Sequence, residues 1–205
     1  MLSRIMAAIE RDDPDDIRIV VERAEKNGDD MILQIAWDES GEARQQACIQ
    51  CRGVPHHNLS LGYADRLELV ADHVVLWPFT EPREQLYFYG PRENADTVLG
   101  ALMREHKRAA GEYLDFWACF NDSLVSDYFD ILSAPSGVLA TGPAPLIRAY
   151  ARALESVGMR HSVLELGPAK HWNGRDWVEN AMPLHALFLG DSLVIAEDFV
   201  ETARL

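Results

Sequence analysis

The first part of the chain has apolar residues at helical spacing. Four of them fall on one face of a helix that begins after a proline and ends at a glycine: Ile17, Val20, Val21 and Ala24. The spacing predicts helices over residues 3–11, 15–26 and 41–52. Met31–Trp37 is mainly apolar, and its periodicity fits a buried strand or a helix equally well, whereas Leu67–Phe79 is strand-like towards its end. Residues 1–80 are therefore predicted to form a mainly helical subdomain.

From residue 84 onwards, runs at strand spacing alternate with runs at helical spacing. Helices are predicted over about 93–108 and from Gly142-Pro143 to near Gly158. Strands are predicted at Gln85–Tyr89, Glu112–Phe120, Asp127–Ser133, Val138–Thr141 and His161–Leu166. Leu184–Leu189 and Ser192–Ala196, joined by Gly190-Asp191, read as a hairpin.

The succession of strand, Gly-Pro, helix and strand occurs twice, at Gly90-Pro91 and at Gly142-Pro143. Two βαβ units within about 80 residues are typical of a ferredoxin-like sandwich. We therefore expect an α+β fold, with residues 81–205 forming a ferredoxin-like domain that ends in the hairpin. A doubly wound parallel sheet is the alternative, because βαβ repeats also build that fold.

Composition and charge exclude several classes of protein. The chain has 205 residues, 48% of them hydrophobic and 25% charged, which is ordinary for a globular protein. Its net charge of -14 disfavours binding to nucleic acids and to anionic membranes. We find no signal peptide and no apolar run of membrane-spanning length. With three cysteines, an odd number in a chain of this size, a reduced, cytoplasmic protein is expected.

One cluster has the residue types of a zinc site: Cys48, Cys51, His56 and His57. The ligand spacing is incomplete, because no second pair of cysteines follows. If residues 41–52 are helical, the two cysteines share one helix face and act as small buried hydrophobes. We favour that interpretation and expect neither a metal nor a cofactor.

The stretch His171–Trp177 combines aromatic and charged side chains around an Asn-Gly turn. His171 and Asp176 are candidates for an acid–base pair, but no motif supplies a nucleophile to them. Aromatic residues such as Trp172 and Trp177 are also enriched at binding surfaces. A clamp of both tryptophans onto the core explains the stretch equally well.

An aromatic and acidic sheet face is predicted in the second half of the chain. Alternation places Tyr87 and Tyr89 on one side of their strand and Tyr113, Asp115 and Trp117 on one side of theirs. An open face of this kind suits a basic protein or a cationic ligand. Alternatively, the N-terminal eighty residues or a second subunit cover it.

No phosphate-binding loop, nucleophile elbow or metalloprotease motif is found in the sequence. The expected function is that of a non-catalytic, acidic interaction or regulatory module, such as an inhibitor or immunity protein, which binds a partner with a basic surface or associates with itself. The alternative is an enzyme or small-molecule binder. It would use His171 and Asp176, or the cysteine and histidine cluster.

Overall fold

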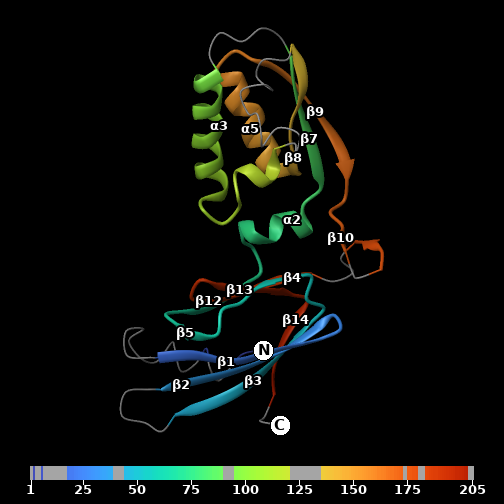
Figure 1. The fold of residues 1–205 in the computed structure, drawn as a ribbon. Coiled ribbons are helices and arrows are strands. Elements are labelled where there is room, and N and C mark those ends of the chain that lie inside the picture. Colours follow the sequence, from blue (N-terminus) through green and yellow to red (C-terminus); the bar gives the residue numbers. More distant parts are fainter. Residues whose placement is uncertain are drawn as a thin grey trace. The chain divides into compact units, whose positions relative to one another are not determined.

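The computed structural model describes residues 2, 6, 18–38, 44–89, 95–120, 135–172, 175–179 and 183–202 (Figure 1). Of the described residues, 51% lie in strands and 25% in helices, so the protein is mainly β. This corrects the predicted α+β class with a mainly helical N-terminal part.

The chain divides into two compact units. The first consists of Met1–Leu76 together with His171–Leu205, and the second of Trp77–Lys170. Each unit has its own cluster of buried apolar residues. The C-terminal hairpin, which the sequence grouped with residues 81–205, lies in the first unit.

The first unit contains a five-stranded antiparallel sheet in the order β14-β3-β2-β1-β5. Its strands are β1 (Arg18–Asn27), β2 (Asp30–Asp38), β3 (Gln45–Arg52), β5 (Gly62–Ala64) and β14 (Asp198–Thr202). The turn between β1 and β2 uses Gly28 at φ 63°, a conformation that glycine adopts without a steric cost.

A second antiparallel sheet of the first unit has the order β4-β13-β12-β6. Its strands are β4 (His56–Asn58), β6 (Leu67–Val70), β12 (His185–Leu189) and β13 (Ser192–Ala196). Leu33 and Ile49 of the first sheet share one core with Leu187 and Val194 of the second. The predicted hairpin at the C-terminus is confirmed, because β12 and β13 are antiparallel neighbours and Leu189 lies opposite Ser192 next to the turn.

The helices predicted at 15–26 and 41–52 are wrong: residues 18–26 lie in β1 and residues 45–52 lie in β3. In β1, Ile19 and Val21 are buried two positions apart, and β-branched side chains pack well on a pleated sheet. Ala47, Ile49 and Cys51 alternate in β3 in the same way. The apolar residues also fit a helical period because some half-buried neighbours of the alternating buried residues are apolar as well. The predicted helix at 3–11 lies outside the described residues.

Two apolar runs in the first half of the chain form different secondary structures. Met31–Trp37, which periodicity left open, is part of strand β2. Leu67–Phe79 begins as strand β6 and ends in a 3₁₀ turn, η2 (Val74–Leu76), followed by the short helix α2 (Trp77–Thr80). The expected strand character towards the end of this run is therefore wrong.

The second unit has two longer helices against one side of a three-stranded sheet (Figure 1). Its elements after α2 are β7 (Arg83–Tyr89), α3 (Ala95–Ala110), η3 (Trp117–Cys119), β8 (Ser136–Pro143), α5 (Ala144–Ser156) and β9 (Arg160–Gly167). The strand order is β8-β7-β9, and β7 is antiparallel to both neighbours. Phe88 packs in the core with Leu102 and Tyr150 of the helices.

Most predicted elements of this unit are confirmed, namely the strands near 85–89, 138–141 and 161–166 and both helices. The ferredoxin-like arrangement is nevertheless wrong. It requires two parallel βαβ units. Here the strand that follows α3, β8, pairs with β7 in the antiparallel direction. The same pairing corrects the doubly wound parallel alternative. The predicted strand at 127–133 lies outside the described residues.

Candidate functional site

The sheet of the second unit carries tyrosines on the face opposite its helices. The buried apolar residues of β7 face α3 and α5, so Tyr87 and Tyr89 lie on the other face. Tyr87 donates a hydrogen bond to Oε1 of Gln85 at 2.6 Å, and the Tyr89 hydroxyl lies 2.9 Å from Oγ of Ser162. The structure thus places these two candidates together on a polar and aromatic surface.

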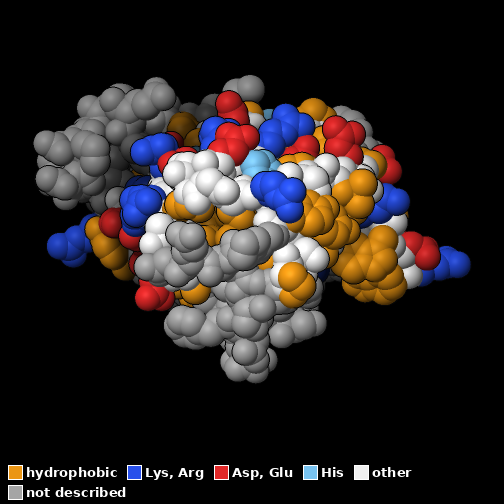
Figure 2. Space-filling view, turned by 90° about the horizontal axis from the view of Figure 1, so that it is seen from above, with side chains coloured by type: hydrophobic (Ala, Val, Ile, Leu, Met, Phe, Trp, Pro, Cys, Tyr) orange, Lys and Arg blue, Asp and Glu red, His pale blue; other side chains and the backbone are white. Residues whose placement is uncertain are grey.

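Strand β9 lies at one edge of this sheet and exposes apolar side chains. Among the described residues it pairs with β7 alone. Val163, Leu164 and Leu166 are 39%, 50% and 49% exposed. On the face shown in Figure 2, hydrophobic side chains also lie at the surface among basic and acidic ones. An edge strand with exposed apolar residues is a ready template for a further strand.

The segment with Tyr113, Asp115 and Trp117 is not the strand that alternation predicts. Phe116 and Phe120, four residues apart, both turn towards the core and contact the ring of Tyr150. That spacing suits a helical turn, and η3 forms there.

In this turn, Oδ1 of Asp115 accepts a hydrogen bond from the Trp117 amide at 2.9 Å. Tyr113 and Trp117 remain 47% and 39% exposed. These three residues therefore do not extend a sheet face with Tyr87 and Tyr89.

The stretch around His171 forms a small hairpin of β10 (His171–Trp172) and β11 (Trp177–Val178). Trp172 and Trp177 are paired across it, with ring centroids 5.9 Å apart, and they are 53% and 64% exposed. Asp176 forms an ion pair with Arg175 at 3.6 Å. Among the described residues, no atom hydrogen-bonds to the buried Nδ1 of His171, so the acid–base pair with Asp176 is not assembled at that nitrogen.

The cysteines of the candidate zinc cluster point away from each other. Cys48 and Cys51 are three residues apart on strand β3, so their side chains emerge on opposite faces. Burial, reinforced by the Asp30 carboxylate, raises the pKa of Cys51 to about 12. Within the described part of the chain, no group of three or more acidic, histidine or cysteine side chains is arranged to hold a metal ion.

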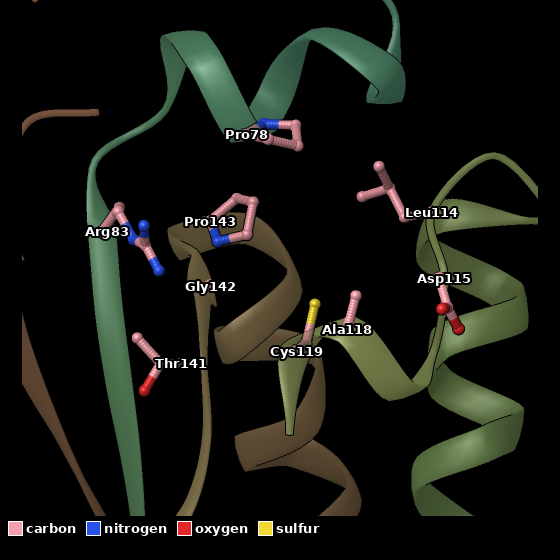
Figure 3. Close-up of a pocket in the computed structure, with 9 residues that line it drawn as sticks. All are labelled: Pro78, Arg83, Leu114, Asp115, Ala118, Cys119, Thr141, Gly142 and Pro143. Atoms are coloured by element: carbon pink, nitrogen blue, oxygen red, sulfur yellow. The ribbon is translucent and has the colours of Figure 1, made fainter. Parts of the chain in front are cut away.

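A pocket of about 180 Å³ lies in the second unit, where β7 begins and β8 ends (Figure 3). Its walls come from three segments far apart in the sequence, residues 78–83, 114–119 and 141–143. The lining residues are Pro78, Arg83, Leu114, Asp115, Ala118, Cys119, Thr141, Gly142 and Pro143. Apart from Asp115, none of them belonged to the predicted site, and no local motif joins them.

Cys119, at the floor of this pocket, is a thiol rather than a thiolate. Burial and the Asp115 carboxylate raise its pKa and the Arg83 guanidinium opposes them, which together give a pKa of about 11. A thiol becomes a strong nucleophile only when it is deprotonated. Cys119 is therefore poorly suited to nucleophilic catalysis at neutral pH.

Alkylation of Cys119 by iodoacetamide at pH 8 is expected to be slower than that of an unfolded cysteine by about one to two orders of magnitude, since little thiolate is present. As the pH rises towards 11, the rate is expected to increase by about tenfold per pH unit. Peptide mapping by mass spectrometry measures the modification at each position. Fast alkylation of Cys119 at pH 8 in the folded protein would contradict the raised pKa.

Comparison of the chain with protein-family models, with curated proteins and with solved structures yields no match. Among the described helices, none is long and apolar enough to cross a membrane.

Proposed function

We propose that the protein is a non-catalytic binding module of the cytoplasm, and that it binds a basic polypeptide which adds a strand to β9. The observation that carries this proposal is the exposed edge of β9 with Val163, Leu164 and Leu166. In strand addition, main-chain hydrogen bonds provide affinity and alternate side chains provide specificity. The tyrosines beside β9 extend this surface with rings that are rigid and can also form hydrogen bonds.

Charge favours a basic partner over a second copy of the chain. The net charge of -14 attracts cationic surfaces during encounter and repels an identical molecule. Most of the acidic excess lies in the first unit and would attract a basic partner during encounter, while β9 in the second unit provides the contact. The three free cysteines fit a reducing compartment.

A matched pair of variants tests the proposal. The tagged protein is incubated with a lysate of its source cells, and the retained proteins are quantified for the wild type, for Leu164→Lys and for Tyr63→Lys. Tyr63 is 68% exposed on β5 of the first unit, so its variant adds the same charge on a strand of the other unit. We expect Leu164→Lys to reduce retention of a basic partner by about tenfold or more, and Tyr63→Lys to leave it unchanged.

Retention alone does not locate the contact, so amide hydrogen exchange is measured on the complex. Exchange in β9 is expected to slow when the partner binds, because its outer amides become hydrogen-bonded. Equal retention by both variants, or unchanged exchange in β9, would overturn the proposal. A dimer of the free protein that Leu164→Lys dissociates would replace the basic partner with a second copy.

A further inference from the structure

The two faces of the sheet present different side chains along β9. Residues directly opposite each other on neighbouring strands share a face. Leu164 lies opposite Gln85, on the face away from the helices. Glu165 lies opposite Glu84, which turns towards α5 and bonds to Arg148 there. A strand added to β9 therefore places neighbouring side chains alternately beside Leu164 on the open face and beside Glu165 on the helix side.

The helix side of β9 is acidic near Glu165. Glu84 is 2% exposed and accepts both hydrogen bonds from Arg148 with one oxygen, Oε1. The pKa of Arg148 is raised by its hydrogen bond and ion pair with Glu84, and further by the charges of Glu165 and Glu81. One guanidinium thus lies among three carboxylates, which leaves an excess of negative charge at this end of β9.

Two of these carboxylates have unused acceptors. Glu165 is exposed, and its side chain hydrogen-bonds to no residue that the structure describes. Oε2 of Glu84 is buried, and within the described part of the chain no group donates to it. A lysine or arginine beside Glu165 forms a charge-assisted hydrogen bond with that carboxylate, and its charge also offsets the negative potential at Glu84.

A second arginine of α5 restricts where a cation fits. Arg152 lies one turn after Arg148 and three residues before Glu155, whose carboxylate lies 3.8 Å from Nε2 of His161 at the start of β9. These spacings place all three on one face of α5, with Arg152 beside the middle of β9. Arg152 is exposed and has no carboxylate partner among the described residues, so it repels a cation there. Cations are therefore favoured only towards the Glu165 end of the strand.

We propose that the strand which adds to β9 carries a lysine or arginine beside Glu165, next to an apolar residue that packs on Leu164. This placement rests on the proposed function and specifies the partner, whose basic residue lies at one end of the added strand. Regular pairing of β9 with β7 stops there, because the register shifts after Glu165. Opposite residues share a face in parallel and antiparallel pairs alike, so the placement is the same for either direction of the added strand.

The test uses two fluorescently labelled peptides and anisotropy with the full chain. The lysine peptide is Thr-Val-Thr-Val-Lys-Val-Thr-Val-Thr with blocked ends, and the glutamate peptide has Glu in place of Lys. We expect the lysine peptide to bind about tenfold more tightly or better. Measurement at 0.15 M salt limits the contribution of distant charges, because the Debye length is then about 8 Å.

Charge reversal at Glu165 locates the contact. Glu165→Lys is expected to reverse the order of the two peptides, since the glutamate peptide then has a cation beside it. Glu179→Lys makes the same change in net charge at an exposed residue of the first unit, and it is expected to keep the wild-type order. The proposal is overturned if the two peptides bind the wild type equally, or if Glu165→Lys keeps the wild-type order.

Amide hydrogen exchange of β9 separates such a failure from a failure of the proposed function. If both peptides slow exchange in β9 but bind equally, strand addition stands and only the basic residue beside Glu165 is wrong. If neither peptide slows exchange in β9 at concentrations up to about 1 mM, strand addition itself is overturned, and the basic residue beside Glu165 with it.

Discussion

Replacement of Arg148 by alanine is expected to lower the free energy of unfolding, and by more than removal of an ordinary surface arginine does. Arg148 lies on α5 and donates from Nη2 and Nε to Oε1 of Glu84, at 2.7 and 3.2 Å. The Glu84 side chain is 2% exposed, and no described residue hydrogen-bonds to its Oε2. Without the guanidinium, a buried carboxylate would remain with no hydrogen-bonded cation.

The size of this effect follows from the unequal exposure of the two partners. Removal of one partner from a buried ion pair costs about 3–5 kcal/mol. The Arg148 side chain is 62% exposed, so water replaces part of its interaction, and we expect a smaller loss than for a pair in which both partners are buried. The pKa of Arg148 is raised by its hydrogen bond to Glu84, which is consistent with a persistent charged pair.

Urea denaturation of the full chain measures this loss, with hydrogen exchange of α3 and α5 assigning it to the second unit. Arg152→Ala is the matched control, because Arg152 is exposed on the same helix and forms no ion pair with the described residues. The double change Glu84→Leu with Arg148→Leu is expected to recover most of the stability. If Arg148→Ala and Arg152→Ala were equally stable, Glu84 would not depend on its partner.

The Glu84–Arg148 pair also illustrates what the sequence could not reveal. The two residues are 64 positions apart, and each resembles an ordinary surface charge in its local context. The same holds for the pocket, whose lining residues come from α2, β7, the turn after α3 and β8. Only the tertiary arrangement brings such residues together.

Local patterns predicted the second unit better than the first. Its helices are long enough for the 3.6-residue period to be distinctive, and Gly-Pro marks the start of α5. In the first unit, residues such as Ile19, Val20 and Val21 fit a helix face and a strand equally well over a short window. Their β-branched side chains were the better signal, because they favour a strand.

Strand order, in contrast, has almost no local signature. The sequence predicted the strand at His161–Leu166 but not that it lies at a sheet edge with both faces exposed. Tyr87 and Tyr89 were grouped correctly because alternation within a single strand is a local property. Their grouping with Trp117 required a second strand, and the packing of Phe116 and Phe120 favours a turn instead.

Replacement of Leu187 by alanine is expected to destabilise the first unit by about 3 kcal/mol. Leu187 is fully buried in the middle of β12, between Val194 of β13 and Leu69 of β6. It belongs to the same core as Leu33 and Ile49 of the five-stranded sheet. A cavity at this position therefore removes contacts from strands that precede it by more than a hundred residues.

Hydrogen exchange resolved by element distinguishes this core from the division that the sequence suggested. If the hairpin belongs with β1–β3, the Leu187→Ala variant is expected to lose protection against amide hydrogen exchange in β2 and β3 and to keep it in α3 and α5. Loss confined to α3 and α5 would instead assign the hairpin to the second unit. Leu193→Ala provides the control, because it removes the same atoms from a half-buried position on β13 outside the core cluster. We expect it to lower the free energy of unfolding by less than Leu187→Ala does.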